Sequence, residues 1–166
     1  VWRVQLESDT NVYGQTETLF AVKNEPLAYY VNDGSTLGDV YCSAMGRSTN
    51  SGLSAQSPLN SLATLLGRYK VEHGDTVYVD TGVYPQSTPL VVSVPAVAPT
   101  NYLVIRGSWN EKYGGSVFTN SGSGAVLDLQ NSQKIEMREL RFHGGGKGLV
   151  LTESSSNLFR GVRAVG

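Results

Sequence analysis

The chain has 166 residues, a net charge of −1 and only 16% charged residues, against a usual value near ~25%. A nearly neutral chain has no overall field that would attract nucleic acid. Glycine, at 19 residues, and abundant Ser, Thr and Asn disfavour a helical protein, because these residues prefer turns and strands. The single cysteine, Cys42, excludes an internal disulfide framework and a Cys-rich zinc site. No apolar run reaches the ~18 residues of a membrane-spanning helix.

Both ends of the sequence fall inside patterned segments. Residues 1–6 alternate like a strand that is already under way, with neither an initiator Met nor a signal peptide, and residues 162–166 form no polar tail. We therefore expect a segment of a longer polypeptide, composed of the end of one domain and the first part of another.

Residues 1–26 are predicted to form a β-hairpin. Trp2, Val4 and Leu6 alternate on one face, residues 7–15 supply turn-forming side chains, and an apolar strand returns over residues 18–22. Two strands alone are marginally stable in water, so the hairpin needs a larger sheet. It resembles the closing strands of a fibronectin type III or immunoglobulin-like sandwich. A hairpin private to this domain remains the alternative.

Residues 27–100 combine strands with one convincing helix. A strand is predicted over residues 28–31, and a long polar loop follows. The helix is predicted to begin at Ser57 or at Asn60 and Ser61, and to end at Gly74. Its apolar face consists of Leu62, Leu65, Leu66 and Tyr69. Strands are predicted over residues 76–80 and 90–94, and residues 81–85 are expected to begin the turn between them.

Residues 101–166 are predicted to form short strands separated by Gly- and Ser-rich turns. The strands are expected over residues 102–106, 125–129, 134–137, 140–142, 148–151 and 157–162. Two segments align loosely with each other: Gly124 matches Gly148 at the start and Leu140 matches Val162 at the end, so that the offset shortens from 24 to 22. Such self-similarity indicates coils that stack on one another and bury their apolar faces.

The order of motifs in residues 28–84 resembles the start of right-handed parallel β-helix proteins of the pectate-lyase-like superfamily. The matching motifs are Tyr29-Tyr30-Val31, Asn50-Ser51-Gly52-Leu53-Ser54, Pro58, Ser61-Leu62 and the segment GDTVYVDTGVY at residues 74–84. The resemblance implies an all-β fold, in which a right-handed parallel β-helix begins with one N-terminal capping α-helix and is preceded by a β-hairpin. Residues 27–100 then contain the cap, residues 101–166 contain the first coils, and the helix covers an otherwise unpaired end of the stack.

The resemblance also implies an extracellular or cell-surface protein. We expect a structural, adhesive or carbohydrate-binding role, with polysaccharides or other surface proteins as partners. The alternative is the N-terminal part of a polysaccharide lyase or uronate epimerase whose catalytic coils lie beyond residue 166. No catalytic residue is assigned within the segment, because none of the family's catalytic motifs matches it. Exposed coil ends predict end-to-end self-assembly.

Basic residues concentrate near the end of the chain, where six of them from residue 134 onward meet three glutamates, a net charge of +3. They are Lys134, Arg138, Arg141, Lys147, Arg160 and Arg163. Residues one coil apart lie above each other, so Arg138 or Arg141 is expected to neighbour Arg160 or Arg163. Such a ladder suits the carboxylates of an anionic sugar. The competing interpretation is a solvated face in which Glu136 and Glu139 pair with the arginines.

Trp109 is a further candidate for carbohydrate binding, with Tyr102 and Tyr113 nearby in the sequence, because aromatic faces stack on sugar rings. Packing within the loop is the alternative interpretation for these aromatic residues.

Asp33 and Asp39 are candidate Ca²⁺ ligands in the long polar loop, with Asn32 and Asn50 nearby. Their spacing departs from the calcium-loop pattern, and turn formation explains the same residues equally well.

Overall fold

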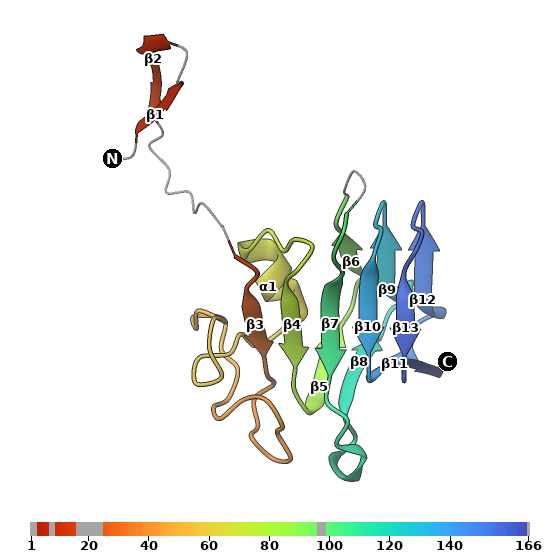
Figure 1. Ribbon diagram of the computed structural model, residues 1–166. Coiled ribbons are helices and arrows are strands. Elements are labelled where there is room, and N and C mark those ends of the chain that lie inside the picture. The colour runs from red at the N-terminus through yellow and green to blue at the C-terminus, as the bar shows by residue number, and fades with distance from the viewer. Residues whose placement is uncertain (1–2, 7–8, 16–24, 96–98, 166) are drawn as a thin grey trace.

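The computed structural model describes residues 3–6, 9–15, 25–95 and 99–165, with side chains described within 25–95 and 99–165. The protein is all-β, with one α-helix and three parallel sheets among the described residues (Figure 1). No helix in these ranges has the length and apolar character needed to span a membrane.

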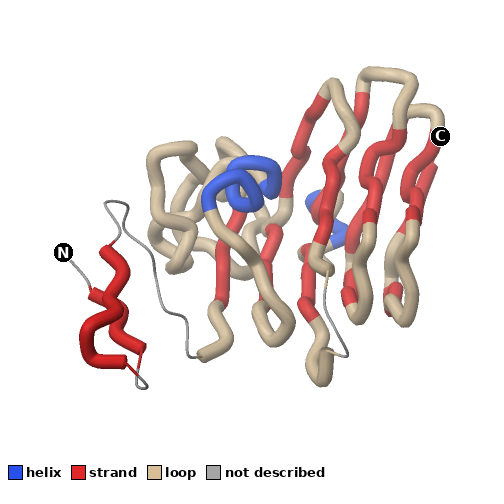
Figure 2. The backbone as a smooth tube through the Cα atoms, turned by 90° about the horizontal axis from the view of Figure 1, so that it is seen from above, coloured by secondary structure: helices blue, strands red, loops and turns tan. Residues whose placement is uncertain are grey.

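Successive parallel strands rotate among the three sheets. The first sheet contains β3 (Ala28–Val31), β4 (Thr76–Val79), β7 (Leu103–Gly107), β10 (Ile135–Arg138) and β13 (Leu158–Arg160). The second contains β5 (Gly82–Gln86), β8 (Ser116–Asn120), β11 (Leu140–Gly144) and β14 (Arg163–Val165). The third contains β6 (Leu90–Ser93), β9 (Ala125–Gln130) and β12 (Lys147–Thr152). Seen from above, the strands of successive turns of the chain follow one another along the molecule (Figure 2). This arrangement is compatible with a β-helix.

The N-terminal hairpin has a different second strand from the one predicted. β1 (Arg3–Leu6) pairs antiparallel with β2 (Asp9–Gln15), which occupies the segment predicted as a turn. Thr10, Val12 and Tyr13 favour an extended chain, and here they outweigh the polar residues between them. The predicted returning strand over residues 18–22 lies outside the described residues, as does Trp2.

The last two turns of the chain repeat at a constant interval. Ala125 pairs with Lys147 on the third sheet, and Arg141 pairs with Arg163 on the second, so both sheets have an offset of 22. The offset of 22 is therefore confirmed, and the offset of 24 at the start of the repeat is wrong. A slip by two positions keeps every side chain on the same face of a strand, so the apolar pattern alone does not detect it.

The turns between these strands repeat at the same interval. Left-handed backbone conformations occur at Asn131 and Glu153, at Lys134 and Ser156, and at Glu139 and Gly161, with φ between 45° and 63°. The two members of each pair have the same offset along the chain as the paired strands. The chain therefore turns in the same way at the same places in both coils.

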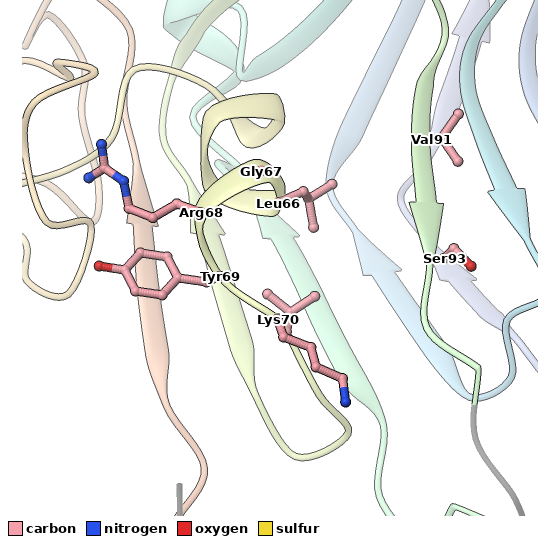
Figure 3. Close-up of a pocket in the computed structure, with 8 residues that line it drawn as sticks. Leu66, Gly67, Arg68, Tyr69, Lys70, Val91 and Ser93 are labelled. Carbon is pink, nitrogen blue, oxygen red and sulfur yellow. The ribbon is translucent and has the colours of Figure 1, made fainter. Parts of the chain in front are cut away.

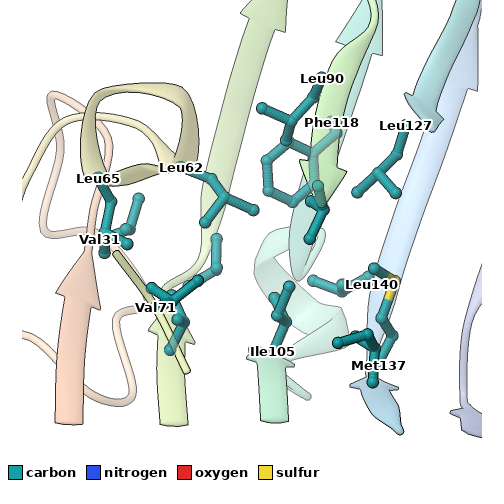
Figure 4. Packing of buried hydrophobic residues seen from close by; sticks show 14 of the residues in the cluster. Val31, Leu62, Leu65, Val71, Leu90, Ile105, Phe118, Leu127, Met137 and Leu140 are labelled. Carbon is teal, nitrogen blue, oxygen red and sulfur yellow. The ribbon is translucent and has the colours of Figure 1, made fainter. Parts of the chain in front are cut away.

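A single apolar core runs between the three sheets (Figure 4). At its centre the rings of Tyr84, Phe118 and Phe142 lie one above another, with centroids 5.2 and 6.1 Å apart. These three residues come from consecutive strands of the second sheet, in register with one another. The parallel register of the second sheet therefore places like side chains on like, as an aromatic ladder requires.

Helix α1 (Leu62–Arg68) covers the core beside β3. The Ser61 hydroxyl caps it by accepting a hydrogen bond from the Thr64 N–H at 3.0 Å, which confirms the second of the two predicted starts. The predicted end at Gly74 is wrong, because Tyr69 is already extended and its ring packs against Tyr29 at 5.2 Å. The buried side chains of Leu62 and Leu65 lie toward Val31 and Val71 (Figure 4).

Three strand predictions need correction. Residues 82–86 form β5 instead of a turn, and Pro85 is tolerated there because β5 is the edge strand of its sheet. β8 was not predicted, since its inward-facing Ser116 and Asn120 interrupt the apolar pattern. The strand predicted over residues 157–162 ends at Arg160 as β13, because the chain turns at Gly161, whose φ is 63°, and the next strand, β14, begins only at Arg163.

The long loop after β3 is attached to the stack by one buried carboxylate. Asp80, fully buried after β4, accepts hydrogen bonds from the backbone N–H groups of Val40, Tyr41, Cys42 and Thr81. A buried charge is stable only when its oxygens are satisfied in this way. Asp75, at the other end of β4, accepts from the N–H groups of Leu27 and Glu72.

We expect Asp80→Asn to lower the free energy of unfolding by about 3 to 5 kcal/mol, because an amide NH₂ would face N–H donors in a buried site. Urea denaturation measures the change. Asp128→Asn is the matched control, since this half-buried carboxylate accepts from the side chains of Gln130 and Thr152, and its loss should cost less than about 1 kcal/mol. Similar losses in both variants would contradict the anchoring role of Asp80.

Candidate functional site

Arginines of successive coils lie in register on two sheets. On the first sheet Arg106 pairs with Arg138, and Arg138 pairs with Arg160. On the second sheet Arg141 pairs with Arg163. The expected neighbours are confirmed, and Arg106 extends the first row by one strand. Neighbouring strands are separated by about 4.8 Å, so the backbone positions of the arginines in each row follow one another at about that interval.

The first-sheet row continues into aromatic side chains. Tyr30 pairs with Tyr78, whose ring stacks on it at 5.4 Å, and Tyr78 pairs with Arg106. Tyr41 packs against Tyr78 at 4.9 Å, and its hydroxyl donates to the carbonyl of Gly107. We call Tyr30, Tyr78, Arg106, Arg138 and Arg160 the tyrosine–arginine row. Arg106 Nε is buried and has no hydrogen-bond partner among the described residues.

The tyrosine–arginine row could not be found from the repeat. Its members follow one another along the chain at irregular intervals, because the connections between the strands differ in length. Only the last interval, from Arg138 to Arg160, equals the repeat seen in the sequence.

Glu136 forms ion pairs with two arginines of this row, Arg138 and Arg160. Its side chain is only 6% exposed and lies 2.7 Å from Arg138 Nη2 and 3.1 Å from Arg160 Nε. The hydrogen bond from Arg138 holds the pKa of Glu136 below its usual range and raises the pKa of Arg138. Because the Glu136 carboxylate is buried, its pairing with Arg138 and Arg160 stabilises the folded structure.

Glu111 pairs with the two arginines of the second sheet. Its Oε1 lies 3.0 Å from Arg141 Nη2 and 3.1 Å from Arg163 Nη2, and its side chain is 63% exposed. The prediction that Glu136 pairs with arginines is confirmed, but Glu139 does not take the second position. The Glu139 carboxylate lies against Gly161, where a Cβ would meet it at 2.6 Å.

Trp109 belongs to the same loop as Glu111, between β7 and β8. The loop contains the short 3₁₀ helix η1 (Glu111–Tyr113), and the Trp109 side chain is 59% exposed. Asn110 Nδ2 donates to the carbonyl of Gly38, which fixes this loop to the long loop after β3. Trp109 is therefore exposed on the loop that carries Glu111, the partner of Arg141 and Arg163.

The two lysines of the predicted cationic set lie elsewhere. Lys134 Nζ donates to the carbonyl of Thr100 and lies 5.8 Å from the ring centroid of Tyr102. Lys147, at the start of β12, lines a hollow of about 310 Å³ with Asp128 on the third sheet. The predicted set of six bases is therefore divided among three faces.

The candidate calcium ligands Asp33 and Asp39 accept hydrogen bonds from other groups of the protein. Asn32 Nδ2 donates to Asp39 Oδ2 at 2.6 Å and to the carbonyls of Ser35 and Ala44. Asp33 accepts from the N–H groups of Ser35 and Val83. Within the part of the chain that the structure describes, no group of three or more acidic, His or Cys side chains is arranged to hold a metal ion. The turn interpretation accounts for the bond between Asp33 and Ser35, whereas the contact of Asp33 with Val83 joins the loop to β5 and that of Asp39 joins two parts of the loop.

A hollow of about 410 Å³ lies between the end of α1 and the edge strand β6 (Figure 3). Leu66, Tyr69 and Lys70 line it from the helix side, and Val91 and Ser93 line it from β6. Among the described residues, none of those that line this hollow is a predicted binding residue. We therefore place the candidate site on the arginine rows.

The chain matches no family model, no curated protein and no solved structure in comparisons with known proteins.

Asp39 should make the stability of the protein depend on pH. Burial, with a smaller contribution from the charge of Asp80, raises the pKa of Asp39 from 3.8 to about 6. The folded state thus binds a proton that the unfolded state has released, so stability falls as pH rises through this interval. Because the carboxyl is partly solvated, we expect a loss of about 1 kcal/mol.

Asp39→Asn removes this dependence, and urea denaturation at several pH values, compared with the wild type, measures the difference. All other titrating groups are present in both proteins. The same pH profile in wild type and variant would show that Asp39 has its ordinary pKa.

Proposed function

We propose that the chain begins a right-handed parallel β-helix of the pectate-lyase-like kind and acts as an extracellular structural or adhesive module that binds anionic polysaccharide. The rotation of parallel strands among three sheets and the helix over one end of the core support the fold. The extracellular setting follows from the resemblance of residues 28–84 to that superfamily.

The observation that carries the binding proposal is the excess of aligned arginines over their partners. Among the described residues, five arginines lie in two rows, and two glutamates pair with four of them. Polysaccharides of uronic acids carry one carboxylate per sugar ring, and a guanidinium binds a carboxylate through paired N–H donors. A row of such groups, spaced by the sheet, suits a polymer that runs along the stack.

Aromatic side chains support the same ligand class. Tyr30 and Tyr78 are partly exposed at one end of the tyrosine–arginine row, and Trp109 is exposed on the loop that carries Glu111. Sugar rings have apolar faces that pack on aromatic rings, while hydroxyl groups at their edges remain hydrated. A surface that offers both arginines and aromatic rings suits a uronate chain better than a simple counter-ion, which has no ring to stack.

Titration calorimetry with oligogalacturonate tests the proposal. The wild type should bind it more weakly as salt is added, and should not bind the neutral methyl-esterified oligomer. The double variant Arg160→Ala, Arg163→Ala should lose about tenfold or more in affinity, because charged hydrogen bonds are removed. Arg47→Ala with Lys70→Ala is the matched control, since it removes the same charge from two exposed side chains outside the rows.

Absence of binding, or equal losses in the two double variants, would refute the binding role. Release of an ultraviolet-absorbing unsaturated product from the same oligomer by the wild type would favour the alternative, a polysaccharide lyase.

A further inference from the structure

We propose that Arg141 and Arg163 form the carboxylate-binding site of this surface, and that Glu111 occupies the site when no ligand is bound. The inference rests on the proposed function and goes further, because it assigns the ligand carboxylate to one pair of arginines and names the group it displaces.

The geometry of Glu111 is that of a bound carboxylate. One oxygen, Oε1, lies within 3.1 Å of a terminal guanidinium nitrogen of both Arg141 and Arg163. The two arginines come from paired positions of β11 and β14, so the sheet places their backbones side by side, and Glu111 Oε1 lies between the two side chains. An acceptor of the same charge and shape fits between them without rearrangement of the backbone. Glu111 thus identifies a carboxylate as the ligand group.

Solvent exposure allows Glu111 to leave. Its side chain and that of Arg163 are each 63% exposed, and exposed ion pairs contribute little to stability. The loop itself stays in place when the side chain turns away, because Asn110 is bonded to Gly38 and the Tyr113 ring packs on Gly38. Arg141 is less exposed and lies near Gly115, so one guanidinium remains positioned.

The first-sheet pair behaves differently because its glutamate is buried. Glu136 lies under Arg138 and Arg160 and contacts both, and a carboxylate in that position cannot exchange with one from solvent. Arg160 and Arg163 are thus matched residues. They lie close together in the chain on successive strands, are 64% and 63% exposed, and differ in whether their glutamate is fixed or free to leave.

The test measures the affinity of four variants for oligogalacturonate at one salt concentration. Glu111→Gln removes the competing charge, and affinity should rise roughly two- to fivefold, which corresponds to an exposed ion pair. Arg163→Ala should weaken binding about tenfold, and Arg160→Ala less than about twofold. Glu139→Gln is the control for net charge, because its carboxylate lies nearby against Gly161, and its affinity should stay near the wild-type value.

A shift of the Arg141 and Arg163 Nε–H resonances on addition of galacturonate gives a second readout that does not depend on variants. These shifts should exceed those of Arg138 and Arg160.

Several results would overturn the inference while the proposed function stands. They are wild-type binding that Glu111→Gln leaves unchanged, equal gains in Glu111→Gln and Glu139→Gln, or a larger loss in Arg160→Ala than in Arg163→Ala. Failure of the wild type and of Glu111→Gln to bind any of these ligands would overturn both.

Discussion

The buried carboxylate of Asp80 is the contact on which the rest of the surface depends. By accepting N–H groups from Val40, Tyr41 and Cys42, it fixes the middle of a long polar loop that has no regular structure of its own. Two consequences follow from this attachment. Tyr41 is placed against Tyr78 at one end of the tyrosine–arginine row, and the carbonyl of Gly38 is placed where Asn110 donates to it. The loop that carries Glu111 and Trp109 is therefore positioned through a carboxylate at the end of β4.

Burial decides what the two glutamates of the arginine rows can do. Glu136 and Glu111 each contact two arginines at similar distances, so these distances alone do not distinguish the two glutamates. Glu136 is covered and has lost its hydration, and separating it from its arginines would leave a buried charge unpaired. Glu111 remains in water, where separating such a pair costs little. The Glu136 pairing is therefore a fixed part of the folded surface. The Glu111 pairing leaves its two arginines available to a ligand.

The length of chain between paired strands varies along the sheets, while the register of the strands stays constant. The interval between paired positions of the first sheet is longest between β3 and β4 and shortest between β10 and β13, yet the outward side chains remain aligned. The extra residues lie in connections such as the loop before α1 and the loop of Trp109, outside the strands. Such loops can carry a binding role without disturbing the core, because the core is formed by alternate residues of the strands alone.

The sequence by itself determined the all-β class and the strands with regular alternation. It limited the helix start to two places and placed Arg138 or Arg141 beside Arg160 or Arg163, and the structure then selected Ser61 and the two aligned arginine pairs. Each follows from a local pattern or from the one pair of coils with equal length. Tertiary structure alone decided β5 and β8, the extension of the row to Arg106 and Tyr78, and the partnership of Glu111 with two arginines. These features join residues separated by irregular loops, and their stability comes from pairing with a neighbouring coil, which no short stretch of sequence contains.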